Sequence, residues 1–213
     1  MANPSPAPVL AGWYVISLRP SGAHGTVRRA AAAWGARVLP ISTLRLLSMD
    51  AGVALDAALA CSIVVFTSPA AVRFARMQRP LVDSPAQVRL AVGSGTATAL
   101  RLAGIAAVRM PPDRADSEGL LALPELQSLR GQAVGLVTAP GGRGLIGETL
   151  AHRGARVHLA EVYRRVAVLP SPARLRRLDD LPATSALLVS SAEAFDGLWS
   201  RLAAAARTRL RAR

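Results

Sequence analysis

One stretch of this chain, residues 134–165, limits its fold more than any other because it combines a strand, a glycine-rich turn and a helix. A short apolar run opens the stretch and predicts a strand buried on both faces. Pro140 and the glycines after it predict a turn, and the apolar spacing from Leu145 predicts a helix that Gly154 would end. Extended character then returns. This order predicts a parallel sheet with a crossover helix, and ligands bind such sheets at the turn after the first strand.

A similar unit lies earlier in the chain, in residues 15–46. The tetrapeptide that starts at Gly35 recurs 119 residues later, starting at Gly154, and residues 64–72 resemble residues 187–195. Matches in the same order predict duplicated halves, although chance, or the strand–helix order common to α/β proteins, is an alternative explanation. In this alignment the second half stops before its third strand, so the chain is expected to be short.

Strands and helices alternate along the whole sequence, which predicts an α/β protein with parallel sheets. Pro40 suits an edge strand or a connecting segment, and Ser117 is a candidate cap for the helix that follows it. The expected strands cover residues 13–18, 38–46, 63–66, 88–92, 106–110, 134–137, 157–162 and 186–190. The expected helices cover residues 25–34, 56–59, 70–77, 96–103, 117–126, 145–153, 172–178 and 192–210.

The chain is strongly basic, with a net charge of +13, and all 26 of its lysine and arginine positions are arginine. A GC-rich coding bias accounts for part of this charge, and the rest indicates an anionic partner. Arginine recognises carboxylates with a planar fork of donors. The arginines are dispersed and aromatic residues make up only 4% of the chain, so the sequence argues against a nucleic-acid surface.

The cysteine and histidine content argues against a thiol nucleophile and against a metal site. Cys61 is the lone cysteine and has apolar neighbours, so a buried structural role is expected. His24, His152 and His158 show no metal-ligand spacing with it. The sequence also shows neither a signal peptide nor an apolar run of about 20 residues, the length that spans a bilayer, so a soluble, cytoplasmic protein is expected.

Small and hydroxyl-bearing residues gather where predicted strands turn into helices. Such turns present free backbone N–H groups and a helix N-terminus to an anion, although a single hydroxyl there is more often a helix cap. The glycines after Pro140 lack the lysine of a nucleotide phosphate loop. The four turns are Thr67-Ser68, Gly93-Ser94-Gly95-Thr96, Gly141-Gly142-Arg143 and Ser190-Ser191.

Five segments in one order carry a more specific signal: VVFTSPAAVRF, AVGSGTATALRLAGI, DSEGLLALPEL, GGRGLIGETLAHRGARV and EVYRR. Together with Arg19-Pro20 after the first strand, they resemble the uroporphyrinogen-III synthase family of tetrapyrrole biosynthesis. The resemblance covers residues 13–195. It implies two parallel-sheet α/β domains joined by a two-stranded connector, near residues 38–46 and 157–168.

The implied first domain is discontinuous, made of residues 1–40 and 167–213, and residues 41–166 form the inserted domain. Members of the family continue past the last helix with a further strand, turn, helix and strand. The first domain is therefore expected to be incomplete at its C-terminal end, which places the activity of this chain in question.

The resemblance implies a lyase that dehydrates and cyclises hydroxymethylbilane to uroporphyrinogen III, inverting ring D, without metal or organic cofactor. Tyr163 matches the family tyrosine that assists loss of the hydroxyl; packing between domains is its alternative role. A surface salt bridge is the alternative role for the candidate arginines, Arg19 and Arg143. The implied substrate-binding residues are Arg19, Thr67, Ser68, Gly93, Thr96, Ser117, Gly142, Arg143, Ser190 and Ser191.

The expected partner is this small-molecule substrate, held between the domains, with hydroxymethylbilane synthase as a transient partner. A monomer that binds neither nucleic acid nor membrane is expected. The alternative function is a non-catalytic two-domain α/β protein that binds a polyanionic ligand.

Overall fold

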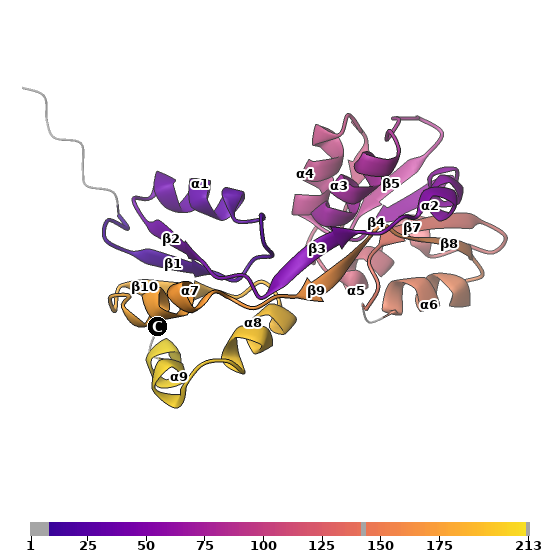
Figure 1. Ribbon diagram of the computed structural model, residues 1–213. Helices are drawn as coiled ribbons and strands as arrows, with labels where there is room; N and C mark the ends of the chain where they lie inside the picture. The colour runs from indigo at the N-terminus through magenta and orange to yellow at the C-terminus, as the bar shows by residue number, and fades with distance from the viewer. Residues whose placement is uncertain (1–8, 142–143, 212–213) are drawn as a thin grey trace, which may run out of the picture. The chain divides into compact units, whose positions relative to one another are not determined.

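Two compact α/β units make up the part of the chain that the computed structural model describes, residues 9–141 and 144–211. Residues up to Leu46 and from Arg165 form unit 1, and Leu47–Arg164 form unit 2 (Figure 1). The boundaries predicted from the sequence are 40/41 and 166/167. None of the helices in the described residues is both long and apolar enough to cross a membrane.

Unit 1 is built on a three-stranded parallel sheet in the order β10-β1-β2. Pro40 ends β2, an edge strand of this sheet, which confirms its predicted place because an edge strand tolerates a missing N–H donor. The strands are β1 (Tyr14–Ser17), β2 (Arg37–Pro40) and β10 (Ser185–Leu188), and the helices are α1 (Gly25–Ala33), α7 (Pro172–Asp179), α8 (Ala192–Trp199) and α9 (Ala204–Arg211).

The single helix predicted over residues 192–210 is wrong, because the structure has two helices, α8 and α9, in its place. The break lets Leu202 and Leu210 join the apolar cluster that contains Ile16. Arg207 Nε donates to the carbonyl of Trp199 at 3.0 Å, which satisfies an orphan acceptor at the end of α8. Burial of apolar residues against the unit 1 core thus outweighs the helix propensity of the intervening residues.

Unit 2 is built on a five-stranded parallel sheet in the order β6-β5-β4-β7-β8. Its strands are β4 (Ile63–Phe66), β5 (Val88–Ala91), β6 (Val108–Arg109), β7 (Ala133–Thr138) and β8 (Arg156–Glu161). Its helices are α2 (Gly52–Leu59), α3 (Pro69–Gln78), α4 (Ser94–Leu102), α5 (Ser117–Leu121), the 3-10 turn Pro124–Leu126 and α6 (Leu145–His152). The predicted class, α/β with parallel sheets, is confirmed.

The predicted helix over residues 117–126 is also wrong in its extent and in its cap. Helix α5 ends at Leu121, and a separate 3-10 turn begins at Pro124. The cap is Asp116, whose Oδ1 accepts the N–H of Gly119 at 2.8 Å, so Ser117 is the first helical residue.

Strand order supports the predicted duplication. In unit 1 the sequence β1–α1–β2 lies beside β10, and in unit 2 the sequence β7–α6–β8 lies beside β4 in the same parallel order. Gly35 and Gly154, which follow α1 and α6, both adopt left-handed conformations, with φ of 82° and 86°. These are positions where glycine has no steric penalty. In unit 2, β5 pairs with the free side of β4.

A two-stranded sheet of β3 (Leu44–Ser48) and β9 (Tyr163–Ala167) forms the connector. The predicted connector strands, 38–46 and 157–168, are therefore too long. Their first parts belong to β2 and β8, which pair with β1 and β7. Between β8 and β9 the chain changes its pairing partner at Val162 without a glycine or proline, so the sequence gives no sign of the change there, whereas Pro40 does mark the end of β2.

Gly135 supplies a test of packing in unit 2. It lies in β7, and a Cβ added there would lie 2.0 Å from the carbonyl oxygen of Ala58 at the end of α2. Because backbone has to move, we expect Gly135→Ala to lower the free energy of unfolding by at least about 2 kcal/mol. Urea denaturation measures this change.

The matched control is Gly147→Ala in α6, where the added Cβ meets only Leu136 Cδ2 at 3.6 Å. That distance is ordinary van der Waals contact, and alanine favours a helix by up to about 1 kcal/mol over glycine. Equal destabilisation by both substitutions would contradict the close approach of α2 to β7.

Candidate functional site

The carboxyl ends of the unit 2 strands bring a tyrosine and a serine together. Ser68 follows β4, Tyr163 begins β9, and their hydroxyl oxygens lie 3.0 Å apart. The Tyr163 side chain is buried, and its ring stacks on Phe74 of α3 with centroids 5.3 Å apart and planes 16° from parallel. This stacking fixes the phenol in place.

Ser68 also caps α3. Its Oγ accepts the N–H of Ala71 at 3.0 Å, and Pro69 occupies the first turn, where its missing N–H costs nothing. With Ser68 Oγ accepting from the backbone, the Ser68 O–H is available to donate to the phenolic oxygen of Tyr163. Either hydroxyl can donate in this contact, and when Ser68 donates, the Tyr163 O–H is left to donate elsewhere.

A second pair of hydroxyls lies at the adjoining strand ends. Thr67 Oγ1 donates to Thr138 Oγ1 at 2.8 Å, which links the ends of the neighbouring strands β4 and β7. Sequence reasoning predicted Thr67 and missed Thr138. The signal was present, because Thr138 ends a buried apolar strand in the same way that Thr67 follows one.

The first turn of α4 supplies backbone donors. Gly93 precedes α4 in an extended conformation and gives it no side-chain cap, so N–H groups of that turn are open to an acceptor. An added Cβ at Gly93 would lie 2.8 Å from Ala115 Cβ, so the loop toward Ser117 packs against this turn. An added Cβ at Gly95 would lie 3.5 Å from Pro69 Cγ, so α3 and α4 start side by side. Thr96, in the same turn, is buried.

The remaining described candidates lie in unit 1. Strands β1 and β10 pair in parallel with Ser17 opposite Leu188, so Arg19 and Ser190 each follow their strand by two residues at the same sheet edge. Ser191 caps α8 by accepting the N–H of Ala194 at 3.3 Å. Arg19 Nε is buried without a hydrogen-bond partner. The candidates Gly142 and Arg143 lie outside the described residues.

A buried histidine supports the loop of Arg19, and sequence reasoning missed it. His24 Nδ1 lies 3.0 Å from Ser17 Oγ, and Nε2 lies 2.8 Å from Ser42 Oγ. Ser42 donates its own hydroxyl to the Arg19 carbonyl at 2.9 Å, so it accepts from His24 Nε2–H, and Ser17 donates to Nδ1. This chain of bonds is satisfied by neutral histidine.

The described residues contain no group of three histidine, cysteine or acidic side chains placed to hold a metal ion. Cys61 is buried and donates to the Ala57 carbonyl at 3.3 Å, and burial raises the pKa of its thiol. The predicted burial of Cys61 is confirmed.

Hydroxyls, helix N-termini and Arg19, at the carboxyl ends of parallel strands, define an α/β protein with sites suited to carboxylates. A sequence model of the family described as uroporphyrinogen-III synthase HemD matches residues 26–212. The chain therefore belongs to the uroporphyrinogen-III synthase family. This membership favours the synthase over a non-catalytic binding protein.

Two curated relatives named uroporphyrinogen-III synthase are similar to parts of the chain. The Salmonella typhimurium protein is 38% identical over 141 residues, which are 65% of this chain and 57% of that protein. The Escherichia coli protein is 38% identical over 110 residues, 52% of this chain and 45% of that protein. The similarity thus spans about half the length of these relatives.

Two solved structures share the fold. A mutant uroporphyrinogen III synthase from Thermus thermophilus matches with a TM-score of 0.55 at 23% identity, over 93% of this chain and 81% of that chain. Uroporphyrinogen-III synthetase from Helicobacter pylori matches with a TM-score of 0.56 at 14% identity, over 90% and 79%. At these identities the likeness concerns the fold.

His24 makes stability depend on pH. Burial, with smaller contributions from Arg28, Arg174 and Arg19, lowers the pKa of His24 from its ordinary value of 6.5. The unfolded chain therefore binds the proton more readily, and stability is lost as pH falls below about 6.5. We expect the free energy of unfolding in urea to decrease from pH 7.5 to pH 5, and this decrease to shrink in His24→Asn.

The control is His152→Gln, at an exposed position that ends α6. It should keep the pH dependence of the unsubstituted protein. A His24→Asn protein with an unchanged slope between about pH 7.5 and pH 5 would show that another group is responsible.

Proposed function

We propose that this chain converts hydroxymethylbilane into uroporphyrinogen III, by loss of the terminal hydroxyl as water and ring closure with inversion of ring D through a spiro intermediate. Family membership supports this reaction. The reaction is proposed to run in the cytoplasm, in a monomer, without metal or organic cofactor. Hydroxymethylbilane synthase is proposed as a transient partner that supplies the substrate.

The paired hydroxyls of Ser68 and Tyr163 are the observation that carries the proposal. The departing hydroxyl of the substrate needs a proton, and the Tyr163 O–H can supply it when Ser68 donates in the hydrogen bond between the two residues. As the phenol loses its proton, the Ser68 O–H stabilises the phenolate oxygen. Because Tyr163 is only 3% exposed, the substrate has to displace neighbouring groups to reach it, and water is kept away from the developing charge.

The carboxylates of the substrate are proposed to bind at the strand ends. The uncapped first turn of α4, beside the start of α3, offers backbone N–H groups and the positive end of a helix dipole. In unit 1, Arg19 has a buried Nε with an unused N–H, and Ser190 lies at the same sheet edge. Gly142 and Arg143 remain predicted binding residues, as do Thr67, Ser117 and Ser191.

A coupled assay tests the reaction. Hydroxymethylbilane is generated in situ, incubated with the chain and oxidised, and the uroporphyrin isomers are separated by chromatography. We expect isomer III in excess over isomer I, which forms spontaneously. A product mixture identical to that of the reaction without the chain would overturn the proposed function.

Tyr163→Phe tests the proton donor separately from packing. The ring keeps its stacking on Phe74 while the hydroxyl is lost. We expect the rate of isomer III formation to fall about 10²-fold, since general acid catalysis is worth that much or more. Stability should change by only about 1 kcal/mol, the value of one hydrogen bond.

The control is Tyr14→Phe, which removes the other tyrosine hydroxyl of the chain. Tyr14 lies in β1 of unit 1 and accepts a hydrogen bond from Arg37 Nη1 at 3.3 Å. Its loss should leave the rate unchanged. A Tyr163→Phe protein as active as Tyr14→Phe would remove Tyr163 from the mechanism.

A further inference from the structure

Unit 2 contains a buried arginine for which the proposed reaction has no use. Arg89 lies in β5 and is only 4% exposed. Its Nη2 donates to the Val82 carbonyl at 3.1 Å and to Gln87 Oε1 at 2.5 Å, whereas Nη1 is buried without a hydrogen-bond partner. Within residues 9–141 and 144–211, no carboxylate forms an ion pair with it. A buried cation without a counter-charge is costly, and proteins normally pair such a charge.

Two hollows have Arg89 in their walls. They lie toward the amino end of the strands, away from Tyr163, because Arg89 is the second residue of β5 and the loop before β5 forms much of both walls. The larger has a volume of about 400 Å³, within the range of small-molecule pockets, and the smaller about 280 Å³. The larger hollow has apolar walls from Leu59, Leu81 and Val82.

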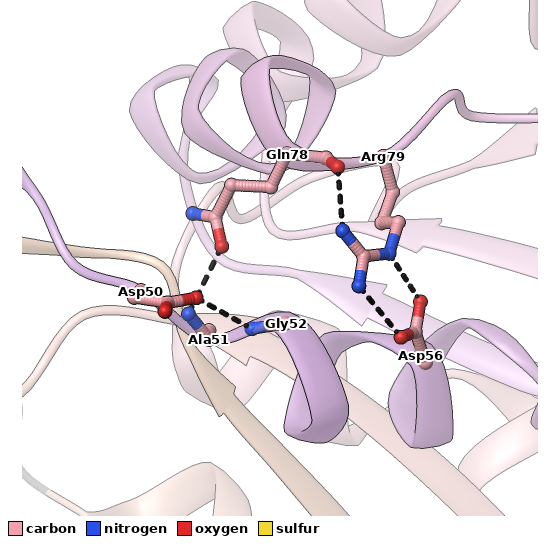
Figure 2. Close-up of polar contacts among 6 residues, drawn as sticks. All are labelled: Asp50, Ala51, Gly52, Asp56, Gln78 and Arg79. Atoms are coloured by element: carbon pink, nitrogen blue, oxygen red, sulfur yellow. Dashed lines mark hydrogen bonds and ion pairs between the residues drawn. The ribbon is translucent and has the colours of Figure 1, made fainter.

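The acid in the larger hollow is already neutralised. Asp56 of α2 accepts a forked pair of bonds from Arg79, at 2.6 Å to Nε and 2.9 Å to Nη2, as Figure 2 shows. Hydrogen bonding to Arg79 lowers the pKa of Asp56. Nearby, Gln78 Oε1 accepts the N–H of Ala51 at 2.9 Å, so a second bond ties α3 to the start of α2 (Figure 2). This wall is therefore fixed and without net charge.

The groups around the smaller hollow do not neutralise Arg89 either. Arg109 is paired with Glu125, and Asp83 accepts the N–H of Ala106 at 3.1 Å. Burial lowers the pKa of Arg89, and the charge of Asp83 only partly offsets that effect. Among the described residues that line the two hollows, Asp83 is thus the acid placed to compete with an incoming anion.

We propose that the larger hollow binds a small aliphatic carboxylate, with its carboxylate on Arg89 and its hydrocarbon chain against Leu59, Leu81 and Val82. A guanidinium offers a fork that matches carboxylate geometry, and a desolvated environment strengthens that contact. Because Nη1 is closed off from solvent, the carboxylate reaches it when the segment over residues 83–86 shifts, while Leu81 and Val82 stay in the wall of the hollow. Gln87 holds the end of this loop, donating to the carbonyls of Leu59 and Cys61 at 2.8 Å and 2.9 Å.

Butyrate and butyramide provide a matched pair of probes, since they differ in charge and hardly in shape. Thermal unfolding of the full chain is followed with increasing butyrate, butyramide or potassium chloride at constant ionic strength. We expect a saturable rise in Tm of about 2–5 °C with butyrate alone. No rise with butyrate, or an equal rise with butyramide or with chloride, would overturn the carboxylate site. The readout does not depend on turnover, so it stands apart from the test of the proposed reaction.

Arg89→Met removes the charge and keeps an apolar side chain of similar length, and it should abolish the butyrate effect. The control is Arg76→Met on the exposed face of α3, which should retain the whole effect. Asp83→Asn removes the competing acid and should increase the affinity for butyrate several-fold. A rise that survives in Arg89→Met would overturn the proposal.

A measurement on the unsubstituted protein covers the case in which Arg89→Met does not fold. In that protein, butyrate should shift the NMR signal of the Arg89 Nε–H and those of residues 80–86 with one common saturation curve. Shifts confined to other residues would contradict the site.

Discussion

Parallel pairing of strands is the constraint on which the rest of this structure depends. It brings all the carboxyl ends of a sheet to one edge, and the helices that follow those strands begin there. Residues that stand far apart in the sequence, such as Ser68 after β4 and Tyr163 after β8, become neighbours in this way. The hydroxyls and backbone donors of unit 2 gather at that edge without a dedicated loop. Arg89, near the other end of its strand, is isolated from them by the length of the sheet.

Buried strands were the most predictable part of the fold. The run Ile63–Phe66 is fully buried and apolar, and its predicted and observed limits coincide. Prediction was wrong where tertiary packing or a change of pairing partner decides the structure. Nothing local to residues 192–210 shows that Leu202 and Leu210 gain more by joining the unit 1 core than by continuing a helix. Pro40 is a local sign of where the chain leaves β1, but nothing local to residues 157–168 shows where it leaves β7.

The residues of the candidate site likewise divide into those that local sequence predicts and those that depend on contacts between distant segments. Thr67, Ser68 and Gly93 were predictable because a small or hydroxyl-bearing residue after a strand has a defined place in a parallel sheet. Tyr163 was inferred from a family resemblance. Its stacking on Phe74 and its bond to Ser68 depend on the pairing of elements distant in sequence. His24 was missed for a different reason: its partners Ser17 and Ser42 lie on two other segments, and a lone histidine gives no local sign that it will be buried.

Ser68 has two roles, and together they limit which residues can replace it during evolution. One hydroxyl both caps α3 and contacts Tyr163. Aspartate and asparagine are equally good caps, so the helix alone would accept them. An aspartate carboxylate has no proton to donate to the phenol, however, and an asparagine carries its donor on a different atom from its acceptor. A substitution at position 68 therefore has to meet two requirements, capping of α3 and donation to Tyr163. Fewer residue types meet both requirements than meet either one alone.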